Sequence, residues 1–467
     1  MNRNVVIVGA GMGGLAAALR LARHGYRVTA LEARLTAGGL AAGFERDGFT
    51  FDAGPYILLD RPGLEWAFRA VGLDPDRLLA LRRLDPVYEV TSADGVVRFC
   101  ADAGQTAAGL DATWPGSGER YLRFIDRLGR VYRRLQPLQQ VSRPGLLALL
   151  RTGGWRHAPF LLRSLASVLE SSGLPRPVVE AMSIWTHVAG QRVEEAPSPL
   201  ALVCAVIHTV GAFYPVGGLG TVPRVLADAV AAAGVEVRYG TQVRAIGCEG
   251  GRVSGVETDR GESLPAAAVV SNHSGVGTYL DLVSETPAPE RERLKALPLQ
   301  SPGVCAYLAI TGDPRPPYLR FFLPGGGQLC RLLIRPAVMD PGVVRDGWQP
   351  ARLLAPMAYA DAERGPDAQR AYLERVLAEG WWREGIAEHR VVATRIPAEW
   401  GAEYHLYRDS MNPVMTARFM RAGRLAHRSP CVPGLYLAGS STHPGQWVSF
   451  CAVSGVLAAD RVREDLA

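Results

Sequence analysis

A run of glycines near the N-terminus, followed by one acid, has the residue types and spacing needed to bind a dinucleotide. The run reads Gly9-Ala-Gly11-Met12-Gly13-Gly14, and Glu32 follows 21 residues after Gly11. The first glycine permits a tight turn, Gly11 lets the backbone approach a pyrophosphate, and Gly14 lets a helix pack closely on a strand. A carboxylate at Glu32 can accept hydrogen bonds from ribose hydroxyls and repels a 2′-phosphate. These residues therefore indicate binding of a dinucleotide through its phosphates and ribose.

The elements that must position this turn are those of a strand–turn–helix–strand unit. Residues 5–8, Val-Val-Ile-Val, predict a strand buried on both faces. A helix with Leu15, Ala18 and Leu19 on one face is expected to end at Gly25, and residues 26–31 predict the second strand. The N-terminus of that helix offers free N–H groups and the positive end of its dipole to phosphates. The complete unit predicts dinucleotide binding far more specifically than the glycines alone.

A second glycine pair distinguishes FAD from NAD. Residues 34–40 read Arg34-Leu-Thr-Ala-Gly38-Gly39-Leu40, and residues 48–55 read Gly-Phe-Thr-Phe-Asp-Ala-Gly54-Pro55. This stretch resembles the fingerprint of an FAD superfamily that contains amine oxidases, protoporphyrinogen oxidase, phytoene desaturases and Rab GDP-dissociation inhibitors. It is most similar to the phytoene desaturases, in which the second glycine pair lies against the pyrophosphate and ribityl chain of the flavin. Leu40 stands where that family usually has an arginine, so the resemblance implies only a backbone contact there.

The C-terminal residues carry a closing motif. Residues 434–445, Gly-Leu-Tyr-Leu-Ala-Gly-Ser-Ser-Thr-His-Pro-Gly, predict a short strand and a glycine-rich turn, with a helix expected over 452–462. They resemble the last motif of phytoene desaturases at Gly439, Thr442, Pro444 and Gly445. Residues 446–451 depart from the small residues of that family. Because this loop is expected to lie against the flavin ring, Trp447 and Phe450 are expected to reshape the pocket.

A middle segment completes the expected FAD-binding domain. Residues 213–220 resemble the family's Tyr-Pro-x-Gly-Gly turn and precede a helix expected over 222–233, and strands are expected over 234–239, 243–246, 253–257 and 267–272. The fold class expected is α/β, with a discontinuous Rossmann-like FAD-binding domain, a mixed α+β substrate domain and a helical lid. The expected boundaries are 1–80, 205–275 and 426–467 for the FAD-binding domain, and 81–204, which includes the lid, and 276–425 for the substrate domain.

The resemblance implies FAD as the cofactor and a set of residues that hold it. These are Gly9, Gly11, Met12, Gly13, Gly14, Glu32, Ala33, Arg34, Gly38, Gly39, Leu40, Gly54, Pro55, Val243, Gly439, Ser440, Gln446, Trp447 and Val448. No second G-x-G-x-x-G unit follows, which argues against a built-in NAD(P)H domain. Electrons are therefore expected to leave for oxygen, a quinone or another small acceptor. No metal is expected, because the seven cysteines are scattered and form no C-x-x-C pair.

Two segments are expected on the substrate side. Residues 115–200 predict mostly helices, and residues 280–420 mix strands over 304–310 and 353–359 with a helix over 367–379. Within 141–170 the apolar residues alternate with arginines, so this stretch is either a lid over an apolar pocket or a basic amphipathic surface for a membrane. The lid is the favoured interpretation, since helical amphipathicity alone discriminates poorly between the two.

Desaturation removes a proton as well as a hydride, and histidines are the candidates for the base that accepts this proton. His443 adjoins the closing motif, and His187 follows an apolar stretch that could face a pocket. Trp447 could stack on the flavin or stabilise a cationic intermediate. His443, Trp447 and His187 are the catalytic candidates, and for each a plain structural role is the competing explanation. His208 is a further histidine for which the structural role is favoured.

The leading hypothesis is an FAD-dependent oxidoreductase that desaturates a carotenoid or another lipophilic, isoprenoid-like molecule. One alternative is a tailoring dehydrogenase that oxidises a C–C or C–N bond of a smaller specialised metabolite. A third hypothesis is non-oxidative, either a flavin-dependent isomerase or a binding protein like the Rab inhibitors; the complete phosphate-binding glycines argue against the latter. A net charge of +6 without a basic run does not favour nucleic acid as a partner. The scattered cysteines suggest a cytoplasmic location, either in solution or peripherally at the membrane.

Overall fold

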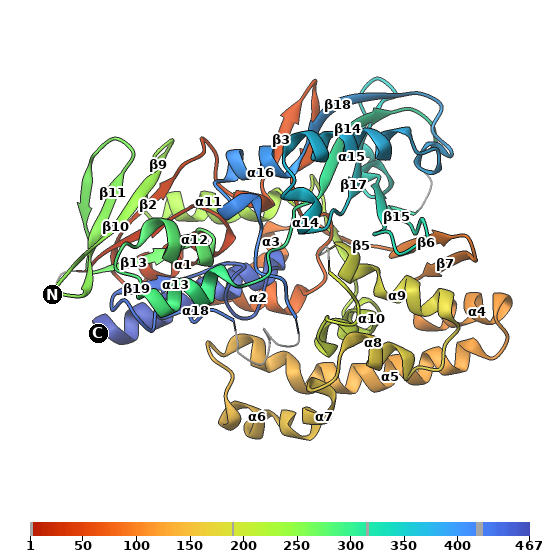
Figure 1. Cartoon of the computed structure of the whole chain (residues 1–467), viewed down its shortest axis with the longest axis horizontal. Coiled ribbons are helices and arrows are strands. Elements are labelled where there is room, and N and C mark those ends of the chain that lie inside the picture. Colours follow the sequence, from red (N-terminus) through yellow and green to blue (C-terminus); the bar gives the residue numbers. More distant parts are fainter. Residues whose placement is uncertain (1–2, 189–190, 314–316, 417–423) are drawn as a thin grey trace.

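The structure, a computed structural model, describes residues 3–188, 191–313, 317–416 and 424–467. It has three parts: a parallel sheet flanked by helices, a large mixed sheet, and a region of helices (Figure 1). Both ends of the chain lie beside the parallel sheet. The α/β fold that the sequence predicts is confirmed, and a helical region is present as well.

Five parallel strands form the sheet that positions the glycine turns. Its order is β19-β13-β1-β2-β9, and every pairing in it is parallel. The strands are β1 (Asn4–Val8), β2 (Arg27–Glu32), β9 (Glu236–Tyr239), β13 (Ala268–Ser271) and β19 (Leu435–Leu437). The central strand β1 has β2 on one side and β13 on the other. The carboxyl ends of these strands therefore meet at a topological switch point, where open parallel sheets bind ligands.

The alternating side chains of β1 explain its uninterrupted β-branched sequence. Val5 and Ile7 pack in the cluster that includes residues of α1 (Met12–Ala22) and α18 (Val448–Leu466). Val6 and Val8 pack in a second cluster, which includes residues of the antiparallel sheet formed by β10 (Val243–Glu249), β11 (Arg252–Thr258) and β12 (Ser263–Pro265). Both faces of β1 are buried, as the sequence predicts. Further helices of this part are α2 (Arg61–Ala70), α3 (Pro75–Leu78), α11 (Thr221–Ala232), α12 (Gly275–Gly277) and α13 (Ala288–Lys295).

The large mixed sheet has the order β18-β14-β17-β16-β15-β6-β7, and only its β6–β15 pairing is parallel. Its strands are β6 (Tyr88–Ser92), β7 (Gly95–Phe99), β14 (Val304–Ile310), β15 (Leu319–Phe322), β16 (Arg331–Ile334), β17 (Gln349–Ala355) and β18 (His389–Arg395). The helices of this part are α14 (Tyr359–Ala362), α15 (Pro366–Ala378) and α16 (Pro397–Tyr404). Two small ribbons pair β3 (Gly43–Arg46) with β4 (Phe49–Asp52) and β5 (Leu81–Arg83) with β8 (Phe213–Pro215).

The helical region contains α4 (Ala103–Thr113), α5 (Ser117–Leu135), α6 (Leu146–Thr152), α7 (Ala158–Leu161), α8 (Leu165–Glu170), α9 (Arg176–Val188) and α10 (Leu202–Thr209). Helix α5 buries Tyr121, Phe124 and Leu128, the apolar residues that recur at helical spacing. Helix α6 buries none of its residues, and its Leu146 and Leu147 are 70% and 76% exposed. Within the described ranges, every helix is too short or too polar to cross a bilayer.

Several element boundaries differ from the sequence prediction. Helix α1 ends at Ala22, because Gly25 lies in the turn that leads into β2 with a positive φ of 78°. Strand β17 ends at Ala355, before Pro356, whereas residues up to 359 were expected to be extended. Helix α18 begins at Val448, before the expected 452. The hairpin of β6 and β7 was not predicted.

Candidate cofactor and active site

The first glycine turn leaves the N-terminus of α1 open. Gly11 is the N-cap of α1 in an extended conformation, and no side chain caps this end. A Cβ on Gly14 would lie 2.0 Å from the carbonyl oxygen of Gly9, and one on Gly13 would lie 2.7 Å from the amide nitrogen of Gly439. The glycines are thus required by close backbone contacts. The uncapped N–H groups of the first turn, Met12 and Gly13 included, suit an anion.

Glu32 ends β2 directly beside this turn and is buried. Its Oε2 accepts a hydrogen bond from the amide of Ala10 at 2.7 Å, and its Oε1 accepts one from the amide of Arg34 at 2.9 Å. The intervening Ala33 is partly buried. The guanidinium of Arg34 lies over the ring of Tyr404 at 4.2 Å, and its Nη1 is buried without a hydrogen-bond partner. An unpartnered buried donor at this position fits a polar ligand group beside Glu32.

The second glycine pair packs against the first turn. The amide of Gly38 donates to the carbonyl of Ala10 at 2.8 Å, and a Cβ on Gly39 would lie 3.3 Å from the Cα of Gly11. Gly38 and Gly39 have positive φ values of 110° and 54°, a region that side chains disfavour. The half-buried Leu40 follows, and a Cβ on Gly54 would lie 2.5 Å from its carbonyl oxygen. The two segments that the sequence singled out are therefore in contact through their backbones, with Pro55 partly exposed beside them.

The closing motif meets the first turn from the other side. Gly439 follows β19 with a positive φ of 91°, and its amide donates to Ser454 Oγ at 2.9 Å. Helix α18 crosses α1 closely, because a Cβ on Gly455 would lie 2.1 Å from the carbonyl oxygen of Gly13. Ser440 is partly buried, and its carbonyl accepts a hydrogen bond from Arg424 at 3.4 Å. Three chain segments thus converge on one end of the parallel sheet.

Asn272 is the residue at this junction that the sequence analysis missed. It follows β13, and its Nδ2 would lie 2.5 Å from a Cβ on Gly11, while its Oδ1 would lie 2.5 Å from a Cβ on Gly13 and 2.7 Å from a Cβ on Gly439. Its side chain therefore fills the space between the two turns. The sequence did contain a signal for Asn272, because it is the last residue of the strand expected over 267–272. The first glycine turn and the closing motif also follow the carboxyl ends of their strands.

The remaining cofactor candidates lie around this junction. Val243 begins β10 and is buried in the cluster that contains Val8 and Leu31. Gln446 is exposed, and its Oε1 accepts a hydrogen bond from Asn412 at 3.3 Å. Trp447 is the N-cap of α18 and contributes no capping hydrogen bond, and its ring stacks on Phe450 at 4.6 Å. Since Val448 is the first residue of α18, a second uncapped helix N-terminus adjoins the closing motif.

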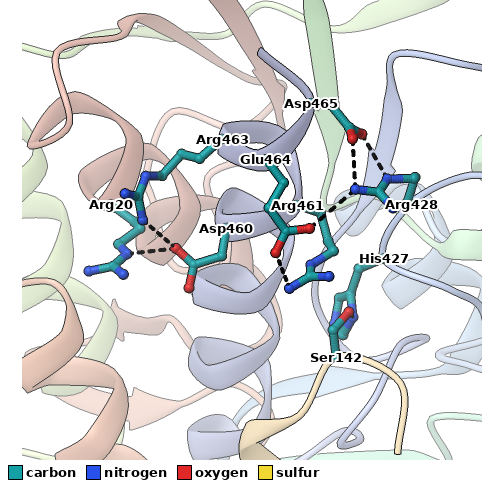
Figure 2. A network of polar contacts seen from close by, with 9 residues as sticks. All are labelled: Arg20, Ser142, His427, Arg428, Asp460, Arg461, Arg463, Glu464 and Asp465. Atoms are coloured by element: carbon teal, nitrogen blue, oxygen red, sulfur yellow. Dashed lines mark hydrogen bonds and ion pairs between the residues drawn. The ribbon is translucent and has the colours of Figure 1, made fainter. Parts of the chain in front are cut away.

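His443 is held by backbone contacts. Its Nε2 donates to the carbonyl of Leu138 at 2.8 Å, so the neutral ring carries its proton on Nε2. Burial lowers the pKa of His443 to about 4. The carbonyl of His443 accepts a hydrogen bond at 2.9 Å from Nε2 of the buried His427, whose Nδ1 accepts one from Ser142 Oγ at 2.8 Å. Figure 2 shows His427 and Ser142 beside α18. The two histidines therefore tie residues 138–142 to the closing motif.

The same view shows what anchors α18. Asp460 accepts hydrogen bonds from Arg20 of α1 at 3.1 Å and from Arg463 at 3.0 Å (Figure 2). Arg428, which precedes β19, donates to both oxygens of Asp465 at 2.7 Å. These half-exposed ion pairs link the C-terminal helix to α1 and to the segment before β19.

His187 lies elsewhere, on the side of the large sheet. It is near the end of α9, and its Nδ1 accepts a hydrogen bond from the amide of Cys330 at 3.1 Å, directly before β16. The proton of the neutral ring is therefore on Nε2, and burial lowers the pKa of His187 below its ordinary value. This hydrogen bond joins His187 to the mixed sheet and not to the glycine turns. His208, by contrast, bonds to the Tyr121 hydroxyl at 2.7 Å, as expected for a structural histidine.

Asp60 is a second residue that the sequence analysis missed. It precedes α2 and is 1% exposed, and neither carboxylate oxygen has a hydrogen-bond partner. Burial raises the pKa of Asp60 to about 6, and the nearby Ser449 hydroxyl and Gly63 amide only partly offset this. Ser449 belongs to the first turn of α18. A carboxyl group that titrates near neutral pH therefore lies close to the closing motif.

Replacing Asp60 by asparagine is expected to stabilise the protein more at pH 8 than at pH 5. The pKa of Asp60 in the folded protein, about 6, exceeds the unfolded value of 3.8. The free energy of unfolding of the wild type therefore falls as the pH rises from 3.8 to about 6 and is constant above that. The total loss is about 3 kcal/mol. Thermal unfolding of wild type and Asp60→Asn across this range tests the expectation. Asp94→Asn, at an exposed turn, is the control. A difference in melting temperature between wild type and Asp60→Asn that is independent of pH would contradict it.

The geometry of the junction fits a dinucleotide. Two helix N-termini without side-chain caps adjoin backbone that lacks Cβ atoms, and Arg34 offers a buried, unpartnered donor. Positive helix ends and free N–H groups suit phosphates, and closely approached glycines admit them. Among the described residues, no group of three or more potential metal ligands lies together. The site is therefore suited to bind an organic cofactor through its phosphates.

Comparison with known proteins identifies that cofactor. The family model described as flavin containing amine oxidoreductase matches residues 12–307, more than half of the chain. The chain belongs to the flavin containing amine oxidoreductase family. This flavin containing oxidoreductase uses FAD, which supplies an acceptor for a hydride equivalent when bound. The FAD and the oxidoreductase activity implied by the sequence resemblance are confirmed.

Relatives of this flavin containing amine oxidoreductase match it over nearly their whole length. A phytoene dehydrogenase of Streptomyces griseus is 31% identical, with 98% of this chain and 95% of that protein aligned. A 4,4'-diapolycopene oxygenase of Methylomonas sp is 27% identical over 100% of this chain and 99% of its own. An oxidoreductase structure from Methanosarcina mazei has a TM-score of 0.68 at 16% identity, covering 99% of this chain and 100% of that one. This last similarity supports the fold alone.

Proposed function

We propose that this FAD-dependent oxidoreductase desaturates a lipophilic, isoprenoid-like substrate by transfer of a hydride equivalent to the flavin. The observation that carries the proposal is the 31% identity, over 98% of the chain, to a protein named phytoene dehydrogenase. The 4,4'-diapolycopene oxygenase, aligned over the whole chain, bears a name from the same substrate class. Electrons leave the enzyme for oxygen, a quinone or another small acceptor.

The proposed FAD-holding residues are those that converge on the carboxyl end of the parallel sheet. The N–H groups of Met12 and Gly13 are directed to the pyrophosphate and Glu32 to a ribose, with the backbone of Val243 near the adenine. Gly38 and Gly39 are assigned to the pyrophosphate and ribityl chain. The backbone contacts come from Gly9, Gly11, Gly14, Ala33, Leu40, Gly54 and Pro55. Arg34 is assigned to the ribose beside Glu32, and the flavin end is assigned to Gly439, Ser440, Gln446, Trp447 and Val448. The tight backbone contacts at Gly13, Gly439 and Gly455 support this assignment.

The contacts of the two histidines limit their part in proton transfer. His443 holds its proton on Nε2 toward Leu138, so only Nδ1 could accept another, and its pKa of about 4 makes it a weak base. His187 uses Nδ1 to bind the Cys330 amide, so its neutral ring has no acceptor nitrogen left. We therefore assign positioning roles to His443 and His187. Trp447 is assigned to the pocket wall near the flavin, and the substrate proton is expected to pass to water.

The proposed domains follow the distribution of strands between the two large sheets. Residues 1–80, 205–275 and 426–467 would form the FAD-binding domain, and they contribute β1, β2, β9, β13 and β19 to the parallel sheet. Residues 81–204 and 276–425 would form the substrate domain, and they contribute the strands of the mixed sheet. Helices α4 to α9 belong to the first of these substrate segments, and α10 crosses its boundary at residue 204.

A peripheral membrane contact through residues 141–170 is part of this proposal. Leu146 and Leu147 of α6 are 70% and 76% exposed. Of the eleven large apolar side chains exposed in the described part of the chain, five lie between 146 and 162. Such a concentration marks an interaction site rather than ordinary surface. A lipophilic substrate dissolved in a bilayer would reach the enzyme from this side.

Anaerobic titration of the FAD-loaded protein tests the proposed reaction. We expect a hydrogenated carotenoid precursor, dispersed in detergent, to bleach the oxidised-flavin absorption in proportion to the product formed. Bleaching only by a polar cell extract would replace this proposal by the tailoring dehydrogenase. Conversion of substrate without net oxidation, and only after the flavin has been reduced chemically, would replace it by the isomerase.

A further inference from the structure

Positive charge is concentrated in one segment of the helical region. Between residues 127 and 169 the sequence has eight arginines and no aspartate or glutamate, whereas the whole chain has a net charge of only +6. The arginines are Arg127, Arg130, Arg133, Arg134, Arg143, Arg151, Arg156 and Arg163. The rest of the chain is therefore close to neutral or slightly acidic, and this segment provides the excess of positive charge.

Most of these arginines surround a cavity of about 810 Å³ between α5 and the segment that contains α7 and α8. Its basic lining is Arg127, Arg130, Arg133, Arg134, Arg163 and His157. Arg127, Arg130 and Arg134 recur at helical spacing, which places them on one face of α5. The wall also contains apolar side chains, among them Val131 and Phe160. The cavity thus combines several cationic groups with an apolar surface.

These charges are poorly neutralised. Among the described residues, Asp126 is the one carboxylate that forms an ion pair with the cavity arginines, through Arg130. Arg127 donates to Ser171 Oγ at 3.0 Å, and Arg163 donates to Ser167 Oγ at 2.9 Å. Burial lowers the pKa of the Arg127 guanidinium, and the positive charge of Arg163 lowers it further. Guanidinium groups that repel one another across a cavity favour an anion between them.

The exposed leucines adjoin this cavity along the chain. Helices α6 and α7 lie at the edge of the helical region, away from both large sheets (Figure 1). Leu146 and Leu147 on α6, with Trp155 and Leu162 around α7, are exposed, and the cavity residues His157 and Arg163 lie among them in sequence. At the surface of an anionic bilayer, the apolar side chains would contact the acyl chains and the arginines would contact the phosphates.

We propose that this cavity binds the phosphate groups of anionic phospholipids while the leucines of residues 146–162 enter the acyl layer. The inference rests on the membrane contact included in the proposed function, and adds a headgroup site with lipid selectivity. A guanidinium group can bind two phosphate oxygens at once, so a cavity lined with arginines is suited to a phosphate group. The site is independent of the flavin, because none of its residues belongs to the glycine turns.

Vesicle sedimentation of the FAD-loaded full chain tests the site. We expect the wild type to bind vesicles of phosphatidylcholine and phosphatidylglycerol more tightly than vesicles of phosphatidylcholine alone. Arg127→Gln/Arg134→Gln removes two charges from the cavity and should weaken binding to the anionic vesicles by about 25-fold, at about fivefold per charge. The control Arg77→Gln/Arg252→Gln removes two exposed charges elsewhere and should leave binding nearly unchanged. FAD content reports whether each variant is folded.

Other outcomes separate the headgroup site from the membrane contact. Equal loss of binding in the control would attribute the preference to net charge and overturn the site. Equal binding to both vesicle types would also overturn it, whereas weaker binding of Leu146→Ser/Leu147→Ser to both would retain the membrane contact. Saturable binding of inorganic phosphate without any preference for anionic vesicles would show a site for free phosphate instead. Flavin reduction by detergent-dispersed substrate reports the proposed function separately in every variant.

Discussion

Gly11→Asp is expected to give a folded but colourless protein. An aspartate at this N-cap would accept hydrogen bonds from the first N–H groups of α1, which stabilises the helix but occupies donors assigned to the pyrophosphate. Its carboxylate would also repel the phosphates. Loss of two charge-assisted hydrogen bonds alone corresponds to at least about 100-fold weaker FAD binding. Flavin absorption per protein and FAD titration of the apoprotein measure the effect.

Two further variants separate the causes of this loss. Gly250→Asp adds the same charge at the β10–β11 hairpin, where a Cβ would meet nothing within 4 Å, and should retain full FAD. Gly11→Asn adds a similar volume and capping group without the charge, and should bind FAD more tightly than Gly11→Asp. A Cβ at Gly11 also displaces Asn272 Nδ2, which lies 2.5 Å away, so some loss is expected from volume alone. A yellow, fully loaded Gly11→Asp protein would overturn the assignment of this turn.

Arg352→Met is expected to destabilise the protein and weaken FAD binding together. The buried Arg352 guanidinium, on β17, donates to the carbonyls of Asp52 and Ala53 at 2.8 Å each and of Gly54 at 2.6 Å. It therefore connects the mixed sheet to the loop that carries Gly54 and Pro55. Removal leaves three carbonyls without this donor, and we expect a loss of about 3–5 kcal/mol in the free energy of unfolding.

A neighbouring arginine provides a matched control for Arg352. Arg331, on β16, is equally buried but pairs with Glu379 at 3.1 Å and does not reach the Gly54 loop. Arg331→Met should lower the melting temperature while FAD affinity of the folded protein stays the same. Arg352→Lys keeps the charge but not the fork of donors, and should fall between wild type and Arg352→Met. Unchanged FAD affinity in a folded Arg352→Met protein would show that the loop is positioned without Arg352.

Strand β1 and helix α6 illustrate what local patterns determine. Val5 to Val8 are β-branched and apolar, and such a run is stable only between two layers, so its place at the centre of a sheet followed from residue type. The leucines of α6 also form an apolar stretch, yet α6 buries none of them. Residue types show that a helix has an apolar surface, but they do not show whether protein or lipid contacts that surface. The sequence therefore leaves a lid and a membrane surface as alternatives for residues 141–170.

The residues that the sequence analysis missed share one property. Asn272 and Arg352 contact segments far away in the chain, and the Asp60 carboxyl lies near Ser449 of α18. Arg352 donates to carbonyls about 300 residues earlier. The β6–β7 hairpin was missed although Asp94-Gly95 is a turn signal, since these strands are short and join a sheet made mainly of later residues. Periodicity reports on neighbours within a few residues, so it cannot indicate which distant side chains meet.

The sequence by itself determined the cofactor class and the architecture of this protein. The first turn, Glu32 and the second glycine pair specify phosphate and ribose binding locally, because backbone freedom and a nearby acid are properties of short segments. Only the tertiary structure decided how the three turns meet, with Asn272 between them, and which nitrogens of His443 and His187 are engaged. Strand order and helix crossing set those distances, and both arise from packing across the whole chain.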